Sequence, residues 1–263
     1  MSPYRMSPWI LIGPLALIAG LGGWLWHSRR EIRRLRQRVE ATACNLESLQ
    51  TSFARFAPDE VIERVLSSGV STSGERKEVT ALFADLVGFT ALSERVEPAV
   101  LVQLLNGYFE RMSGAITEQR GYVSTFLGDG ILAFFGALQS NPWQANDAAH
   151  AALAMRRALE DYNKELADGG LPLLALGIGL HRGTGVAGLV GCRELMQYAF
   201  VGRTVNLAAR VQDLTRGTDA DILVTEAVRD GLDSRFVLRP MAAASVRGIE
   251  QPVATWAVDR FDE

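Results

Sequence analysis

The sequence predicts an α+β fold in which a ferredoxin-like β-α-β-β-α-β domain follows a single transmembrane helix and a coiled-coil helix. Three observations predict it. An uncharged apolar stretch lies near the N-terminus, a heptad pattern follows it, and from residue 75 onward short apolar runs alternate with longer amphipathic ones. With 48% hydrophobic and 22% charged residues among 263, the chain is neither disordered nor a protein with many membrane spans.

The apolar stretch runs from Trp9 to Trp26 and contains no charged side chain. As a helix it would be about 27 Å long, close to the ~30 Å hydrocarbon core of a bilayer. The alternatives are a cleaved signal peptide and a buried core helix. Against cleavage, the stretch ends in Leu25-Trp26-His27 instead of small residues. We therefore expect residues 1–28 to anchor the chain in the inner (cell) membrane, with the lipid bilayer as a partner.

Arginines crowd the segment that follows this stretch. By the positive-inside rule they place the rest of the chain in the cytoplasm and the N-terminus outside. The net charge of the chain is −3, so overall charge gives no argument for nucleic acid as a partner. Membrane topology and anionic lipid explain the basic run. It consists of Arg29, Arg30, Arg33, Arg34, Arg36 and Arg38.

Residues 29–57 carry a heptad pattern. β-Branched residues at its early a positions with Leu at d favour a parallel two-stranded coiled coil, and the alternative is a helix that packs on its own domain. Since two helices that leave one membrane face in parallel would pair naturally, we expect a homodimer. Residues 58–74 are expected to be a short helix and a polar linker before the domain of residues 75–263. The a positions are Ile32, Val39, Leu46 and Phe53, and the d positions are Leu35, Thr42 and Leu49.

The remaining elements follow from periodicity and from turn residues. A buried strand ends at Asp85, and a helix begins at Pro98, whose fixed φ suits a first helical turn. Strands, a long alanine-rich helix and a further strand complete the β-α-β-β-α-β order, and a helix and three strands follow. The later elements are expected at residues 122–126, 131–135, 146–166, 174–180, 204–215, 222–224, 236–246 and 253–258.

Two aspartates gain meaning from this order. In a split β-α-β unit the third strand lies between the first two and runs antiparallel to them, so Asp85 at the end of one strand and Asp129 at the start of another converge on one edge. Two close carboxylates repel, and a hard cation such as Mg²⁺ removes that penalty. The alternative is a pair of turn or cap residues. The three histidines lack metal-ligand spacing, so we expect structural roles for them.

A glycine-containing loop follows the first of these aspartates. Its backbone N–H groups precede a helix and are typical of a phosphate cradle. The cradle residues are Leu86, Val87, Gly88, Phe89 and Thr90.

With these features in place, residues 75–258 resemble the catalytic domain of the class III nucleotidyl cyclases, which include adenylyl and guanylyl cyclases. The resemblance is carried by residues 74–90 (GERKEVTALFADLVGFT), 126–136 (FLGDGILAFFG) and 198–210 (YAFVGRTVNLAAR). It implies a head-to-tail pair of chains that converts a nucleoside triphosphate into a 3′,5′-cyclic monophosphate and pyrophosphate. It also implies that Asp85 and Asp129 hold two divalent ions, Mg²⁺ or Mn²⁺, in each active site.

The resemblance assigns roles to three further residues. Asn206 would orient the ribose, and Arg210 would stabilise charge on the phosphate; both come from the partner chain, and their i, i+4 spacing puts them on one helix face. Arg247 matches a position that contacts the terminal phosphates in the family, with an ordinary surface role as the alternative.

The base pocket departs from the family pattern. Adenylyl cyclases place a lysine and an Asp, Thr or Ser where this chain has Thr125 and Ala199, and guanylyl cyclases typically use Glu and Cys there. We expect ATP as the substrate, with GTP or a pyrimidine triphosphate as the alternative. A nucleotide-binding sensor with little turnover is the rival from another functional class.

Overall fold

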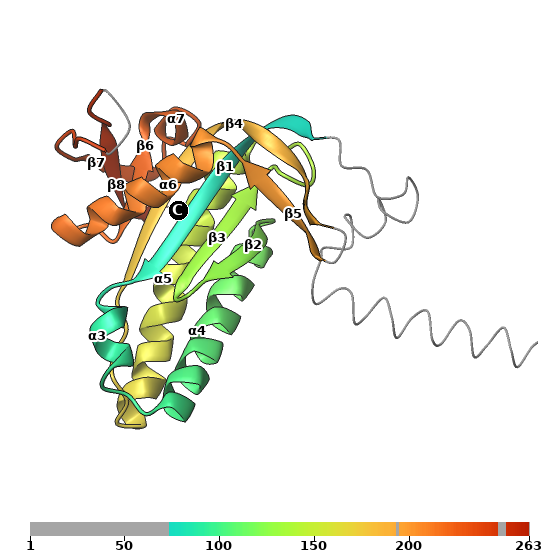
Figure 1. Cartoon of the computed structure of the whole chain (residues 1–263). Coiled ribbons are helices and arrows are strands. Elements are labelled where there is room, and N and C mark those ends of the chain that lie inside the picture. Colours follow the sequence, from blue (N-terminus) through green and yellow to red (C-terminus); the bar gives the residue numbers. More distant parts are fainter. Residues whose placement is uncertain (1–73, 193–194, 247–250, 263) are drawn as a thin grey trace, which may run out of the picture. The chain divides into compact units, whose positions relative to one another are not determined.

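The computed structural model describes residues 74–192, 195–246 and 251–262 (Figure 1). The expected anchor, coiled coil and linker lie outside this part of the chain, apart from Gly74. Arg247 lies outside it too. Across the described ranges, no helix is both long and apolar enough to cross a membrane.

One sheet of eight strands organises these residues, in the order β2-β3-β1-β4-β6-β8-β7, with β5 paired to β4 (Figure 1). Strand β1 pairs antiparallel with β3 and with β4, and β3 pairs antiparallel with β2. The strands are β1 (Glu75–Leu86), β2 (Tyr122–Leu127), β3 (Gly130–Phe135), β4 (Leu176–Cys192), β5 (Leu195–Val201), β6 (Ile222–Thr225), β7 (Phe236–Pro240) and β8 (Thr255–Phe261).

Helices cover both faces of the sheet. The two long helices α4 and α5 lie side by side on one face, and α6 lies on the other (Figure 1). Glu97 caps α4 because its carboxylate accepts hydrogen bonds from the backbone N–H groups of Ala99 and Val100. The helices are α3 (Phe89–Ser93), α4 (Pro98–Glu118), α5 (Gln144–Asp168), α6 (Arg203–Leu214) and α7 (Glu226–Arg229), and a 3₁₀ turn (Thr215–Gly217) follows α6.

The expected β-α-β-β-α-β order is confirmed by β1, α4, β2, β3, α5 and β4. Strand β3 lies between β1 and β2, as the split β-α-β arrangement requires. The main apolar core fills the space between the sheet and the pair α4 and α5, and it includes Leu82, Tyr108 and Met155. A smaller cluster with Phe134 and Phe200 lies outside this core, and it includes Ala208 of α6.

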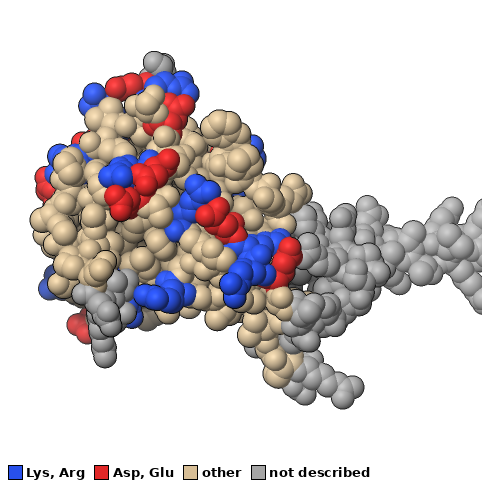
Figure 2. Space-filling model, turned by 90° about the horizontal axis from the view of Figure 1, so that it is seen from above, with Lys and Arg blue, Asp and Glu red and all other residues tan. Residues whose placement is uncertain are grey.

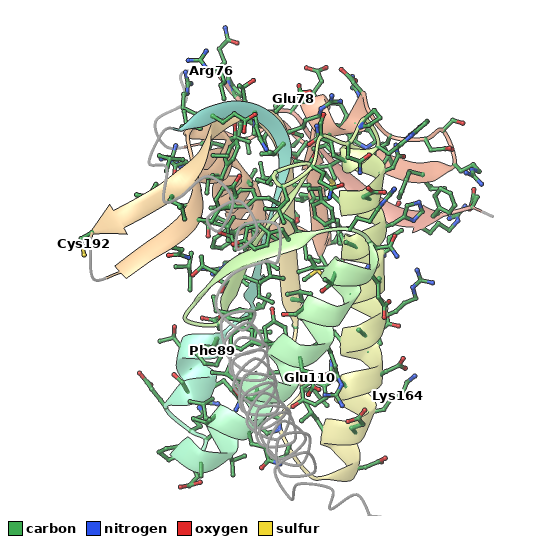
Figure 3. The ribbon with its side chains drawn as sticks, turned by 90° about the vertical axis from the view of Figure 1, so that its right-hand side faces the viewer. Arg76, Glu78, Phe89, Glu110, Lys164 and Cys192 are labelled. Carbon is green, nitrogen blue, oxygen red and sulfur yellow. The ribbon has the colours of Figure 1, made fainter. Side chains whose placement is uncertain are left out.

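Strand β4 differs most from the sequence prediction. It was expected to end at residue 180 but runs from Leu176 to Cys192 and turns back as β5, which the sequence analysis did not predict. The hairpin projects from the sheet and carries Cys192 at its end (Figure 3). A strand is predicted from the alternation of apolar and polar side chains. Glycines occupy many positions of this strand, so the alternation is not apparent in the sequence.

The last two strands also differ from the prediction. Strand β7 ends at Pro240, which has no N–H group to continue the pairing, so the expected strand over residues 236–246 is too long. Strand β8 starts and ends later than the expected 253–258, and only an isolated bridge joins Ala244 to Val253.

The glycines of β4 have a steric reason. A Cβ atom on Gly179 would lie 2.2 Å from the backbone nitrogen of Gln212 and 2.5 Å from the carbonyl oxygen of Ala208. The backbone of α6 therefore packs directly on β4. A Cβ on Gly183 would lie 2.7 Å from Oγ1 of Thr204, so the start of α6 is equally close. These contacts fix the position of α6, which carries Asn206 and Arg210.

Candidate active site

The structure brings the two predicted aspartates together. Asp85 precedes the last residue of β1, and Asp129 lies in the turn between β2 and β3. The two carboxyl groups are close enough that Asp129 raises the pKa of Asp85. Oδ2 of Asp129 also accepts a hydrogen bond from the backbone N–H of Leu86, at 3.2 Å. The β1–β3 pairing, with Ala84 opposite Ile131, places both residues at the same edge of the sheet.

The surroundings of Asp85 favour its protonated form. The pKa of Asp85 is raised from 3.8 to about 6. Burial is the largest cause, and the interaction with the neighbouring Asp129 carboxylate adds to it. An ion pair with Arg216, whose Nη2 lies 2.5 Å from Oδ2 of Asp85, acts in the opposite direction. The buried hydroxyl of Tyr108 has no hydrogen-bond partner among the described residues, and burial and the two carboxylates raise its pKa. The positive charge of Arg216 therefore does not fully offset the negative charge of Asp85 and Asp129.

These donors suit a divalent cation. Carboxylate oxygens are hard ligands that Mg²⁺ and Mn²⁺ prefer, and repulsion between them falls when a cation binds. Over residues 74–192, 195–246 and 251–262, no group of three or more His, Cys, Asp and Glu side chains could hold a metal. An ion held by Asp85 and Asp129 would therefore complete its shell with water or with oxygens of a bound molecule, as Mg²⁺ commonly does with substrate phosphates.

The loop after Asp85 offers fewer free amides than the sequence predicts. The N–H of Leu86 donates to Asp129, and the N–H of Val87 donates to the carbonyl oxygen of Ala175 at 2.8 Å. Gly88 then takes a left-handed φ of 73°, which a glycine adopts without strain, and α3 begins. The amides of residues 88–90 therefore form the part of the expected cradle that remains at a helix start.

Asn206 and Arg210 line a separate cavity of about 360 Å³. His181 is part of the same wall, although the sequence analysis did not place it near a site. Its Nδ1 lies 2.9 Å from Oγ1 of Thr225, and burial lowers its pKa to about 4, so the ring is neutral near pH 7. The sequence did contain a signal for this position. Leu176, Ile178 and Leu180 alternate along β4, so His181 lies on the opposite face of the strand from these core residues. The full lining is His181, Gly183, Thr184, Arg203, Thr204, Asn206, Leu207 and Arg210.

Within one chain the aspartates and this cavity are apart. Neither aspartate lines the cavity. In the β1–β4 pairing, Asp85 lies opposite Gly177, whereas His181 lies opposite Ala81. Four residues of strand correspond to about 13 Å. The residues expected to act on one substrate therefore form two half-sites on this chain.

The two base-pocket positions come from two strands that are not paired with each other in the sheet. Thr125 lies on β2 and Ala199 on β5. These strands approach each other where Nε2 of Gln197 donates a hydrogen bond to the carbonyl oxygen of Ser124, at 3.2 Å. The Thr125 hydroxyl donates to the carbonyl oxygen of Phe126 at 3.4 Å, which is a long contact for a hydroxyl donor.

Comparison with known protein families identifies the family of the domain that contains these half-sites. The model of the adenylate and guanylate cyclase catalytic domain matches residues 72–260. The chain belongs to this cyclase family. The match covers the described sheet, both aspartates and the helix that carries Asn206 and Arg210.

The curated relatives of this cyclase domain include adenylate cyclases. An adenylate cyclase of Anabaena cylindrica is 33% identical in an alignment of 224 positions that covers 81% of this chain and 44% of the relative. Adenylate cyclase 1 of Rhizobium meliloti is 32% identical over 199 residues, which are 75% of this chain and 30% of the relative. The chain thus spans less than half the length of either curated relative.

Two crystal structures share the fold. The guanylyl cyclase Cya2 is 34% identical with a TM-score of 0.69, and the match covers 72% of this chain and 95% of that one. The adenylyl cyclase CyaB from P. aeruginosa is 28% identical with a TM-score of 0.68, over 72% of this chain and 97% of that one. The fold of the cyclase domain and its likeness to both kinds of cyclase are thereby established.

Proposed function

We propose that this chain is a membrane-anchored, homodimeric nucleotidyl cyclase that converts ATP into 3′,5′-cyclic AMP and pyrophosphate. The observation that carries the proposal is the separation of the two half-sites in a chain that belongs to the cyclase family. One chain holds the paired carboxylates at one edge of the sheet and Asn206 with Arg210 in a cavity farther along it. A second copy in head-to-tail orientation supplies the missing half to each site.

The reaction joins the ribose 3′-oxygen to the α-phosphorus, breaks the bond from that phosphorus to the bridging oxygen, and releases a proton and pyrophosphate. Bound divalent ions would supply Lewis acidity for the attacking hydroxyl and charge neutralisation for the triphosphate. Asp85 and Asp129 would hold these ions. The amides of residues 88–90 bind phosphate oxygens at the start of α3. Arg210 donates two hydrogen bonds to the phosphate that gains charge, and Asn206 fixes the ribose.

The β4–β5 hairpin supports pairing of two chains. It projects from the sheet (Figure 3), and it exposes the apolar side chains of Val186, Val190 and Val201. Val186 and Val201 lie opposite each other in the β4–β5 pairing, so they form one patch. An exposed apolar patch on a projecting hairpin is typical of a contact surface between protein chains.

ATP is the proposed substrate because these curated relatives are named adenylate cyclases. The sequence resemblance to the guanylyl cyclase Cya2 is equally high, so similarity leaves GTP as the alternative. Thr125 and Ala199 offer a hydroxyl and a methyl group to the base. A pocket without several buried hydrogen bonds to a base edge discriminates weakly, so we expect measurable turnover of more than one triphosphate.

The remaining parts of the proposal concern location and partners. We propose that residues 1–28 hold the chain in the inner membrane and that residues 29–57 pair two chains on the cytoplasmic side. The uncharged stretch from Trp9 to Trp26 and the arginines after it support this orientation. We propose no nucleic-acid partner; on the face shown in Figure 2, basic and acidic side chains are interspersed without a continuous basic surface.

Turnover of the full-length chain tests the function. The chain is incubated with ATP, GTP, CTP or UTP and with Mg²⁺ or Mn²⁺, and pyrophosphate and cyclic nucleotide are measured. We expect cyclic AMP as the main product. If the chain binds nucleotide but releases no pyrophosphate with any of the four triphosphates, the cyclase proposal is contradicted. The result would then favour the nucleotide-binding sensor.

Single replacements test the assigned roles. Asp85→Asn, Asp129→Asn and Arg210→Ala should each lower turnover at least ~100-fold, because each removes a group that contacts the reacting phosphates or their metal ions. Asp262→Asn is the matched control, since Asp262 is an exposed residue that pairs with Arg260 just beyond the end of β8. Substantial turnover in one of the three variants would refute the role given to that residue.

A further inference from the structure

Arg216 belongs to the carboxylate half-site, although no sequence motif pointed to it. It lies in the 3₁₀ turn after α6, and its Nη2 is 2.5 Å from Oδ2 of Asp85. Its second contact with an acid, from Nη1 to Asp213, is longer at 4.0 Å. The Arg216 side chain is 52% exposed, whereas that of Asp85 is 17% exposed. A solvent-accessible guanidinium thus pairs with a largely buried carboxylate.

The fold holds the turn in this position. Gly177 lies directly opposite Asp85 in the β1–β4 pairing. A Cβ atom on Gly177 would lie 2.2 Å from Oγ1 of Thr215, so only a glycine lets the turn approach β4 this closely. The Thr215 hydroxyl donates to the carbonyl oxygen of Gln212 at 2.7 Å, which ties the turn to the last part of α6. Arg216 therefore starts from a backbone that is fixed beside the carboxylate.

This position conflicts with a bound metal ion. Mg²⁺ lies about 2.0–2.1 Å from each ligating oxygen, and a guanidinium carries its positive charge at every physiological pH. A divalent ion and Arg216 on the same oxygen of Asp85 would repel each other at short range. Metal binding would therefore weaken the pair between Arg216 and Asp85, and the exposed Arg216 side chain has room to move.

We propose that Arg216 is a two-position residue, paired with Asp85 in the nucleotide-free chain and bound to the triphosphate once divalent ions take the carboxylates. The second position follows from octahedral geometry, because adjacent oxygens on one Mg²⁺ are about 3 Å apart. A phosphate oxygen that shares an ion with Asp85 lies that close to the oxygen Arg216 now contacts. The planar guanidinium fork also binds phosphate through two hydrogen bonds. The phosphate half of this inference rests on the proposed function.

Binding measurements without turnover test both positions. Full-length wild type, Arg216→Gln and Arg216→Lys are titrated with Mn²⁺, and free Mn²⁺ is read by electron paramagnetic resonance. Inorganic triphosphate is then titrated by calorimetry with Mn²⁺ in excess, which makes the result independent of the base. Arg239→Gln is the matched control, because Arg239 is another half-exposed arginine in an ion pair, with Asp219.

We expect Arg216→Gln to bind Mn²⁺ about three- to tenfold more tightly and triphosphate about three- to tenfold more weakly, whereas Arg239→Gln changes neither. Arg216→Lys should bind triphosphate with intermediate affinity. In an Asp85→Asn background, Arg216→Gln should no longer change the Mn²⁺ affinity. Unchanged Mn²⁺ affinity of Arg216→Gln overturns the proposal, and tighter Mn²⁺ with unchanged triphosphate affinity overturns its second position. If the wild type turns over no nucleotide but Arg216→Gln still binds Mn²⁺ more tightly, the proposed cyclase activity is refuted. The pairing of Arg216 with Asp85 against the metal is then retained.

Discussion

His181 is a neutral imidazole in the wall of the α6 cavity, and its burial has a consequence for stability. Burial lowers its pKa to about 4, whereas in the unfolded chain it is close to 6.5. Between these values the unfolded state binds more protons than the folded state. The protonation of His181 therefore leaves the stability of the fold unchanged with pH above ~6.5, and it lowers the stability as the pH falls from there toward 4.

We predict that His181→Gln makes the free energy of unfolding less sensitive to acid. Both proteins are unfolded with urea at pH 7.5 and at pH 5. The wild type should lose more stability between these two values than the variant does, because glutamine does not titrate. An equal loss in both would show that His181 titrates with the same pKa in the folded and unfolded chains.

Gly179 is a residue at which the packing of α6 on β4 allows no side chain. Gly179→Ala would place its Cβ 2.2 Å from the nitrogen of Gln212, and neither backbone can move alone. We predict a loss of about 1–3 kcal/mol in the free energy of unfolding, measured by chemical denaturation. Gly114→Ala is the control, since nothing lies within 4 Å of that position in α4 and alanine favours a helix by about 1 kcal/mol. Comparable stability of the two variants would contradict the close approach.

At the scale of elements, Arg156 connects α5 to the strands at the end of the sheet. Its Nε and Nη2 each donate to a carboxylate oxygen of Asp221 at 2.6 Å. Nη1 donates to the carbonyl oxygen of Asp259 at 2.7 Å, and Nη2 also donates to that of Val258 at 2.8 Å. One planar group thus joins a helix, the residue before β6, and β8.

We predict that Arg156→Lys destabilises the fold by about 1–3 kcal/mol, because an ammonium cannot reproduce the paired hydrogen bonds or reach both strands. Urea unfolding measures the change. Arg260→Lys is the matched control, since Arg260 forms an exposed pair with Asp262, and it should change stability by less than about 0.5 kcal/mol. Equal effects of the two replacements would rule out the joining role of Arg156.

The sequence allowed the approach of Asp85 and Asp129 to be predicted, because element order alone fixes which strand ends meet in a split β-α-β unit. It did not allow the length of β4 to be predicted. Strand periodicity depends on side chains, and Gly183 and Gly185 have none because Thr204 and Phe200 fill their space. That reason exists only in the folded chain.

Contacts between distant segments explain the other differences. The Arg216–Asp85 pair joins residues 131 positions apart in the sequence, and nothing local in sequence distinguishes Arg216 from a surface arginine. The Leu86 and Val87 amides were expected to bind phosphate, but Asp129 and Ala175 accept their hydrogen bonds. Such partners become visible only when the sheet brings the turn and the strand together.

At the scale of the whole molecule, two half-sites per chain give a test of assembly. We predict that Asp85→Ala chains mixed with Arg210→Ala chains recover activity after unfolding and refolding together. Random pairing makes about half of the dimers mixed, and each mixed dimer has one complete site of two, so about a quarter of the wild-type rate should return. Pyrophosphate release measures it. A mixture as inactive as each parent would exclude a site shared between chains.

The distance between the carboxylates and the α6 cavity also determines how defects would behave in a cell that makes two versions of the chain. An excess of Asp85→Ala chains leaves every wild-type chain with one complete site, because the altered partner still provides Arg210. The defect is recessive. A chain that carries Asp85→Ala and Arg210→Ala together provides neither half, so each wild-type chain paired with it is silenced. We predict that this double variant is dominant and lowers cyclic nucleotide in co-expressing cells, whereas either single variant in equal excess does not.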